Sequence, residues 1–115
     1  MPTISVDIVI ITYNRPTGLS KLLESLAKST NHFQSRIGVI VVNNNSNDKH
    51  AALYEKTISE FTAFPIKYLH ENRQGSSWAR NCGISNSLAE YIAFLDDDEQ
   101  VDANWLSTLV RNFED

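Results

Sequence analysis

The chain has 115 residues, of which 42% are hydrophobic and 21% charged, and its formal net charge at pH 7 is −4. This length allows a single domain, residues 1–115, and the composition is that of a folded globular protein rather than a disordered one. The negative charge gives no electrostatic footprint for nucleic acid, so we expect no nucleic-acid partner. The single cysteine, Cys82, excludes an internal disulfide and fits a reducing compartment.

The first half of the chain predicts two strand–helix pairs. A strand is predicted over Val6–Ile11, which is apolar and β-branched apart from Asp7. Pro16 suits the first turn of a helix, and four leucines follow it at the spacing of one helical face. These leucines are Leu19, Leu22, Leu23 and Leu26. A second strand, Ile37–Val42, precedes a weaker helical pattern. The apolar residues of that weaker pattern are Leu53, Ile58 and Phe61.

The second half continues the alternation. A short strand is predicted over Pro65–Leu69 and a helix over about Ser77–Leu88. The predicted core contacts of this helix are Trp78, Ile84 and Leu88. A fourth strand is predicted over Tyr91–Leu95, and Asp102 is expected to cap a last helix. The apolar face of that helix carries Trp105, Leu106, Leu109, Val110 and Phe113.

Four strand–helix pairs in this order predict an α/β fold, β-α-β-α-β-α-β-α, with a Rossmann-like, mainly parallel sheet and flanking helices. Polar clusters follow three of the predicted strands, at Thr12–Arg15, Asn43–Asp48 and Asp96–Glu99. Because the carboxyl ends of parallel strands meet at one edge of a sheet, we expect these clusters to gather there and form a ligand site.

The segment Asp96–Glu99 places four like charges directly after a predicted buried strand. Crowded carboxylates repel one another, and a hard divalent cation carrying a diphosphate would compensate their charge. In an extended segment Asp96 and Asp98 project to the same side. The alternative is a solvated acidic loop that precedes the next helix.

Other catalytic and nucleotide-binding motifs are absent from the sequence. Neither G-x-G-x-x-G nor a P-loop follows the first strand, which disfavours a dinucleotide dehydrogenase and an NTPase. No G-x-S-x-G is present, which disfavours a serine hydrolase. Cys82 lacks an accompanying His or Asn signature, so we interpret it as a structural thiol.

Four blocks of the sequence occur in a recognisable order. They comprise residues 9–15, 41–46, 71–75 followed by 79–84, and 90–98, the last containing the D-x-D pattern Asp96–Asp98 and followed by Trp105–Leu106. In this order the blocks resemble the amino-terminal half of family 2 glycosyltransferases, which have the GT-A fold. The resemblance covers nearly the whole chain and implies a truncated GT-A fold.

The resemblance implies roles for individual residues. Asp98 would ligate Mn²⁺ or Mg²⁺ with Asp96 as a further metal ligand, while Asp96 or Asp97 would hydrogen-bond the ribose. Arg80 would assist with phosphate charge, and a salt bridge from its helix to the acids is the alternative. The residues so implied in nucleotide-sugar binding are Thr12, Tyr13, Asn14, Arg15, Asn44, Arg80, Asp96 and Asp97.

The second block departs from the family pattern. Many members carry Asp-Asp where Asn43 and Asn44 stand, and the second acid accepts the N3–H of uracil or thymine. An Asn oxygen can still accept that hydrogen bond, and its NH₂ can donate to a base carbonyl, without charge assistance. The expected donors are UDP- and dTDP-sugars, with GDP-sugars as a further option. The alternative is a plain strand-to-helix turn over Asn43–Asp48.

By the resemblance, the full-length protein would be a metal-dependent, inverting glycosyltransferase acting on a saccharide or lipid-linked acceptor in polysaccharide biosynthesis. The catalytic base is expected beyond Asp115, so we expect the 115-residue chain to be a fragment without the acceptor half and inactive alone. The alternatives are a non-catalytic nucleotide-binding module and a fragment completed by self-association, as a homodimer through its exposed edge. We expect a cytoplasmic protein, with peripheral association at the inner face of the membrane as an option for the full-length form.

Overall fold

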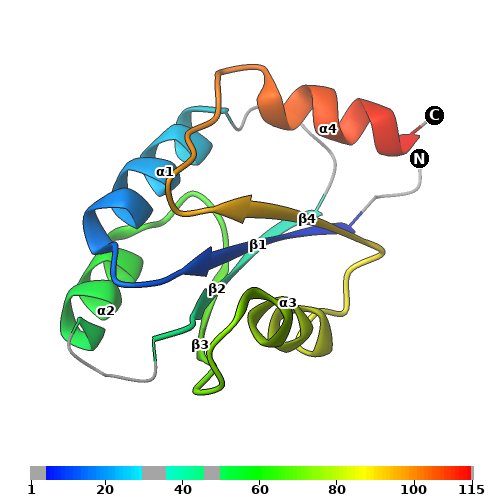
Figure 1. The fold of residues 1–115 in the computed structure, drawn as a ribbon. Coiled ribbons are helices and arrows are strands. Elements are labelled where there is room, and N and C mark those ends of the chain that lie inside the picture. The colour runs from blue at the N-terminus through cyan, green and yellow to red at the C-terminus, as the bar shows by residue number, and fades with distance from the viewer. Residues whose placement is uncertain (1–4, 30–35, 46–49, 115) are drawn as a thin grey trace.

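Strands and helices alternate along the whole chain (Figure 1). The computed structural model describes residues 5–29, 36–45 and 50–114. The elements are β1 (Ser5–Thr12), α1 (Pro16–Ser29), β2 (Arg36–Asn43), α2 (Ala51–Glu60), β3 (Ile66–His70), α3 (Ser76–Ser85), β4 (Tyr91–Asp96) and α4 (Trp105–Glu114). The predicted β-α order is confirmed, and α1 begins at Pro16 as expected. Within the described ranges, none of these helices has the length and apolar character needed to cross a bilayer.

The sheet is parallel throughout and has the strand order β3-β2-β1-β4. The register pairs Thr12 at the end of β1 with Asn43 at the end of β2. On the other side of β1, Ile11 pairs with Asp96 at the end of β4. The register therefore brings the polar segments that follow these three strands to one edge, as predicted.

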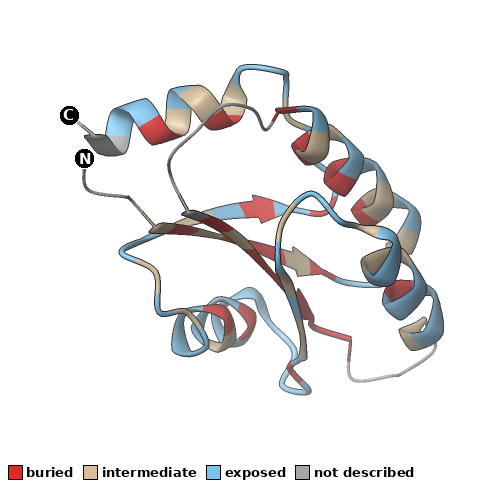
Figure 2. Cartoon of the chain, turned by 180° about the vertical axis from the view of Figure 1, so that it is seen from behind, coloured by how far each residue is buried: buried red, intermediate tan, exposed pale blue. Residues whose placement is uncertain are grey.

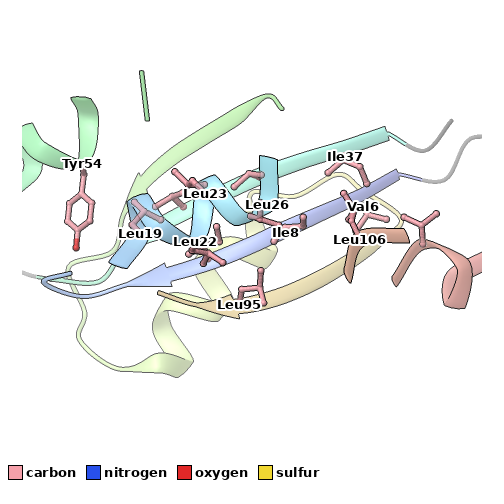
Figure 3. Packing of buried hydrophobic residues seen from close by; sticks show 14 residues of the cluster. Val6, Ile8, Leu19, Leu22, Leu23, Leu26, Ile37, Tyr54, Leu95 and Leu106 are labelled. Atoms are coloured by element: carbon pink, nitrogen blue, oxygen red, sulfur yellow. The ribbon is translucent and has the colours of Figure 1, made fainter. Parts of the chain in front are cut away.

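The larger part of the hydrophobic core lies between the sheet and helices α1, α2 and α4. All four leucines of the α1 stripe are buried, and Figure 3 shows them facing Val6 and Ile8 of β1. Leu106 and Val110 of α4 join the same core. Burial of each large apolar side chain contributes about 1.5–3 kcal/mol, so the leucine periodicity that predicted α1 also explains why it docks on this face.

Among the described elements, α3 alone covers the other face of the sheet, and here the sequence prediction of the core is wrong. Trp78, Ile84 and Leu88 are 44%, 47% and 102% exposed, and α3 ends at Ser85 rather than near Leu88. The buried residues of α3 are Ala79 and Gly83. A Cβ added at Gly83 would lie 2.5 Å from Cγ1 of Val9.

The reason is the close approach of α3 to β1. A helix that lies so near a strand admits only small residues at the line of contact, so its large apolar residues must point elsewhere. Figure 2 shows this difference, with α3 exposed over most of its surface and β1 and β2 largely buried. Spacing of large apolar residues alone therefore indicated the wrong side of this helix.

The start of α4 differs slightly from the prediction. Asp102 lies ahead of the helix, and its Oδ1 accepts a hydrogen bond of 2.9 Å from the backbone N–H of Asn104. The backbone carbonyl of Asp102 accepts from the N–H of Trp105 at 3.2 Å. Asp102 thus closes the turn that leads into α4.

Candidate functional site

The chain leaves β1 through a tight turn that carries four of the predicted binding residues. Asn14 adopts a positive φ of 58°, a left-handed conformation that Asn tolerates better than most residues. Its Oδ1 accepts a hydrogen bond of 3.3 Å from the side chain of Asn45, which follows β2. Tyr13, Asn14 and Arg15 are exposed, whereas Thr12 is fully buried. The turn therefore presents three side chains at the edge and directs one inward.

Thr12 is joined to the acidic segment by a set of contacts that we call the acid-loop network, formed by Thr12, Tyr13, Arg15, Tyr54 and Asp97. Oδ2 of Asp97 accepts from the hydroxyl of Thr12 at 2.8 Å and from the N–H of Tyr13 at 3.0 Å. Oδ1 of Asp97 lies 3.5 Å from Nε of Arg15. The carboxylate of the middle acid of the D-x-D pattern is therefore bound by the end of β1 and the loop that follows it.

Tyr54 completes this network and was not identified from the sequence. Its hydroxyl lies 2.9 Å from Oγ1 of Thr12 and accepts a hydrogen bond of 2.9 Å from the N–H of Arg15. Tyr54 is fully buried, whereas Leu53, which the helical pattern favoured, is 52% exposed. Tyr54, Ile58 and Phe61 follow at i, i+4 and i+7, so a search for that spacing with Tyr counted as apolar finds the correct face of α2.

Asp96 and Asp98 lie on either side of the buried Asp97, and both are exposed. Of the two predicted ribose partners, only Asp96 is therefore accessible, and its role toward a ribose stays a prediction. Oε1 of Glu99 accepts from the N–H of Asp96 at 2.7 Å, and the N–H of Glu99 donates to the carbonyl of Asp96 at 3.0 Å. These reciprocal hydrogen bonds close the acidic turn, so Glu99 stabilises its backbone.

Negative charge at this turn is only partly compensated. Desolvation, followed by the charges of Glu99 and Asp98, raises the pKa of Asp96 above its ordinary value. The positive charge of Arg80 acts in the opposite direction. Within the described part of the chain, Arg80 makes no ion pair with these acids, so the salt-bridge alternative is not found and its phosphate role stays a prediction.

The acidic turn suits a hard cation that is shared with another ligand. Among residues 5–29, 36–45 and 50–114, no group of three or more His, Cys, Asp and Glu side chains is arranged to hold a metal ion. Two exposed carboxylates, Asp96 and Asp98, nevertheless supply oxygen donors of the kind that Mg²⁺ and Mn²⁺ accept. The raised pKa of Asp96 marks charge that a cation would relieve. The residues therefore fit a cation whose remaining ligands come from water or phosphate.

Asn44, the predicted base-reading residue, lies in a second buried group that we call the Asn44 clamp, formed by Asn44, Glu71, Arg73 and Gly75. Its side-chain NH₂ donates to the carbonyls of Glu71 and Arg73 at 3.0 and 2.8 Å. Its Oδ1 accepts from the N–H of Gly75 at 2.9 Å. Both amide hydrogens are thus used within the protein, and one lone pair of Oδ1 is left for the predicted contact with a base.

The neighbouring Asn43 acts as a turn residue. Its Oδ1 accepts from the N–H of Asn45 at 3.1 Å, and its NH₂ donates to the hydroxyl of Tyr68 at 2.9 Å. This Asx-type bond agrees with the alternative of a strand-to-helix turn at the start of the segment. Residues 46–49, which were part of that interpretation, lie outside the described residues.

The loop held by the clamp carries its own ion pair. Nε and Nη2 of Arg73 donate to the two carboxylate oxygens of Glu71 at 3.1 and 3.0 Å. The guanidinium also lies 4.0 Å from the ring centroid of Trp78, so this exposed tryptophan makes a cation–π contact with the loop. The hydrogen bond with Arg73 holds the pKa of Glu71 below its ordinary value.

Two cavities of similar volume lie at opposite ends of the parallel strands. One of about 370 Å³ borders the acidic turn and is lined by Arg15, Lys21, Asp98 and Glu99, among others. The other, of about 380 Å³, is lined by residues near the amino ends of the strands, including Asp7 and Gly38. Only the first is adjacent to the acids and to the turn after β1, so we assign the candidate site to that edge.

The sequence matches the model of glycosyl transferase family 2 over residues 7–115, and the chain belongs to this family. It is 40% identical over 109 residues to the succinoglycan biosynthesis protein ExoM of Rhizobium meliloti (strain 1021). The aligned region covers 95% of this chain and 35% of that relative. It is 29% identical over 106 residues to the glycosyltransferase GlyA of Streptococcus pneumoniae serotype 4, which covers 92% of the chain and 14% of that relative. The chain thus spans about a third or less of the length of these relatives.

Solved structures of glycosyltransferases share the fold. The mannosyltransferase PcManGT from Pyrobaculum calidifontis, in complex with GDP-Man and Mn²⁺, superposes with a TM-score of 0.81 at 19% identity. The match covers 96% of this chain and 32% of that one. S. aureus TarS 1-349 in complex with UDP gives a TM-score of 0.78 at 22% identity, with the same coverage. The expected GT-A architecture is therefore confirmed.

Proposed function

We propose that this chain is the donor-binding part of a glycosyltransferase that binds a nucleoside-diphosphate sugar through a divalent cation. In the full-length protein, the sugar would pass to an acceptor hydroxyl with inversion. The observation that carries the proposal is the placement of exposed Asp96 and Asp98 on either side of an anchored Asp97, at the edge where β1, β2 and β4 end. The family membership supports the reaction class.

The residues of this chain would divide the work of donor binding. Asp98, with Asp96 beside it, would hold Mn²⁺ or Mg²⁺, and such a cation stabilises negative charge on a departing diphosphate. Tyr13 is 47% exposed at the end of β1 and would offer its ring to the nucleoside. Arg80 would add positive charge from α3. Thr12 would act indirectly, because its hydroxyl donates its hydrogen bond to Asp97.

UDP- and dTDP-sugars are the donors we propose first, with GDP-sugars as the further option. Asn44 would supply its remaining Oδ1 lone pair to the base, and a saccharide or lipid-linked molecule would be the acceptor. Two structural neighbours, TarS in complex with UDP and PcManGT in complex with GDP-Man, support a nucleotide ligand of this class. We propose polysaccharide biosynthesis as the process, at the cytoplasmic face of the membrane, and a catalytic base supplied from outside these 115 residues.

Calorimetric titration tests the proposal. UDP, dTDP and GDP are titrated into the wild-type chain with Mn²⁺ and with EDTA, and into Asp98→Asn. We expect binding that requires Mn²⁺ and is lost in Asp98→Asn. The matched control is Glu90→Gln, which neutralises an acid next to the opposite end of β4 and should bind like wild type. Absence of metal-dependent binding for all three nucleotides would contradict the proposal.

Self-association is a second candidate property, supported by the open edge of the sheet. β4 is an edge strand, and its residues Tyr91 and Phe94 are 36% and 41% exposed. Exposed edge strands with apolar side chains pair readily with further strands. Analytical ultracentrifugation of wild type and Phe94→Lys separates the cases, since a dimer through this edge would dissociate in the variant.

A further inference from the structure

The hydroxyl group of Tyr54 occupies an unusual place for a helix residue in the core. Tyr54 belongs to α2, yet Figure 3 shows its hydroxyl reaching toward the end of β1, away from the leucines that fill the rest of this core. The side chain is fully buried. A buried hydroxyl needs partners, and Tyr54 finds both of them in the segment that begins the candidate site, at Thr12 and Arg15.

The chemistry of the groups fixes the direction of each hydrogen bond in this chain. The N–H of Arg15 can only donate, so Tyr54 accepts from it. The carboxylate of Asp97 can only accept, so the single hydrogen of the Thr12 hydroxyl is given to Asp97. Thr12 therefore has no second hydrogen to give, and Tyr54 must donate to Thr12. The result is one directed relay from Arg15 through Tyr54 and Thr12 to Asp97.

The position of Asp97 decides where its neighbours point. β4 ends at Asp96, and Asp97 and Asp98 form a turn that the N–H of Glu99 closes on the carbonyl of Asp96, in place of the extended segment expected from the sequence. Within this turn the side chain of Asp97 is buried, whereas those of Asp96 and Asp98 are exposed. The backbone of Asp97 is also held, because its carbonyl oxygen lies where a Cβ on Gly18 would come within 2.5 Å. Side chain and backbone together leave the acidic turn little freedom to rotate its outer carboxylates away.

We propose that Tyr54 is a positioning residue of the donor site. By donating to Thr12, its hydroxyl orients the Thr12 hydroxyl toward Asp97 and so keeps Asp96 and Asp98 directed outward, where a cation and a diphosphate would bind. This inference rests on the proposed function. It assigns a role to a residue of α2 that touches neither the cation nor the nucleotide.

A purely structural role for Tyr54 is the competing explanation, and a matched pair of variants separates the two. Tyr54→Phe keeps the ring and removes a buried hydroxyl that accepts from the N–H of Arg15. Ser29→Ala removes a buried hydroxyl that accepts from the N–H of Leu106 at 3.0 Å, between α1 and α4 and away from the acids. Ser29 is 3% exposed, so both changes remove one buried hydroxyl that satisfies one backbone N–H.

Amide hydrogen exchange, followed by NMR, reads the acidic turn without any nucleotide. The diagnostic amides are Tyr13, which donates to Asp97, and Glu99, which donates to Asp96. We expect both to exchange about tenfold faster in Tyr54→Phe than in wild type, and to be unchanged in Ser29→Ala. Unchanged exchange at Tyr13 and Glu99 in Tyr54→Phe would overturn the proposal.

Nucleotide titration with Mn²⁺ on the same proteins gives the functional readout. We expect Tyr54→Phe to weaken binding about tenfold and Ser29→Ala to leave it unchanged. Displacement of the Asp96 and Asp98 carboxylates would weaken binding directly, whereas a loss of stability far from the site would not. Thr12→Val, which removes the middle of the relay, should weaken binding similarly, and Tyr54→Phe should then add little to it. Additive losses in the double variant would overturn the relay.

The two readouts also separate this inference from the proposed function. If the wild-type chain binds none of UDP, dTDP and GDP with Mn²⁺, the proposed function fails. The exchange rates at Tyr13 and Glu99 then decide by themselves whether Tyr54 orders the acidic turn.

Discussion

The acid-loop network and the Asn44 clamp lie at the ends of neighbouring strands and solve the same problem differently. Each holds a loop by one buried polar side chain: a carboxylate, Asp97, in the first and a neutral amide, Asn44, in the second. Across the described residues, no buried side-chain nitrogen or oxygen lacks a hydrogen-bond partner. A polar residue at a strand end can thus order a loop through hydrogen bonds within the protein, whether or not it also contacts a ligand.

The two regions differ in how their charge is balanced. In the clamp loop, Arg73 pairs with Glu71 through two hydrogen bonds, so this loop neutralises itself. Around Asp97, the exposed Asp96 and Asp98 keep charge that no ion pair in the described ranges offsets. A cation is therefore expected at the acidic turn and not at the clamp.

The largest effect is expected when the same substitution is made at two adjacent acids. Asp97→Asn removes the negative charge from the group that accepts from Thr12 and Tyr13, and with its oxygen kept on these donors it turns its NH₂ toward the Arg15 guanidinium. We expect this change to lower the free energy of unfolding by about 3 kcal/mol. Asp98→Asn alters an exposed side chain and should change stability by less than about 0.5 kcal/mol. Urea denaturation measures both. Equal stability of the two variants would show that the inward orientation of Asp97 is not maintained.

A slightly smaller loss is expected at the clamp. Asn44→Asp replaces two donated hydrogen bonds by a carboxylate oxygen facing the carbonyls of Glu71 and Arg73, which should cost about 2 kcal/mol. The same urea series measures this. The control is Asn72→Asp, an exposed position in the same loop. A more stable Asn44→Asp protein that binds UDP more tightly would instead favour a direct role for this residue in base recognition.

Overpacking at Gly18 should displace the acidic turn and lower the free energy of unfolding by about 1–2 kcal/mol. An added Cβ at Gly18 would lie 2.5 Å from the carbonyl oxygen of Asp97, whereas one at Gly38 would lie 2.6 Å from Oδ1 of Asp7, far from the acids. We expect Gly18→Ala to lower the melting temperature more than Gly38→Ala, because the clash at Gly18 is with backbone and the clash at Gly38 is with the end of a side chain that can turn aside. Only Gly18→Ala should weaken Mn²⁺-dependent nucleotide binding, and equal affinities would argue against contact between α1 and the acidic turn in solution.

The smallest effect is a pH dependence of opposite sign in the two regions. The raised pKa of Asp96 means that its contribution to stability is present below the pKa of the unfolded chain and is lost as pH rises through the folded value. The lowered pKa of Glu71 gives the reverse: stability present above the unfolded pKa and lost as pH falls through the folded value.

Stability curves from pH 3 to 7 for Asp96→Asn and Glu71→Gln check these signs, with changes of less than about 1 kcal/mol expected at the exposed Asp96. Relative to wild type, Asp96→Asn should gain stability as pH rises, and Glu71→Gln should lose it. The same slope for both variants would contradict the contrast in charge balance.

Local pattern was sufficient where one short-range preference dominated. The leucine stripe of α1, Pro16 at its start and the apolar strands gave the element order, the parallel sheet and the edge where the polar segments meet. The sequence of α3 misled, because its contact with Val9 selects small residues and leaves Trp78 and Ile84 outside. Apolar spacing reports a buried face only when the neighbouring element leaves room for large side chains.

The residue types of the candidate site could be predicted from the sequence. They are three adjacent aspartates after one predicted strand, a Thr-Tyr-Asn-Arg turn after another and an asparagine pair after a third. Which of these side chains point inward was decided by tertiary structure alone. Asp97 is turned inward by Thr12, 85 positions away in the sequence, and Asn44 is held by a loop some 30 residues further on. Orientation depends on partners that only folding brings near, whereas the character of a strand or a helix is already contained in its own residues.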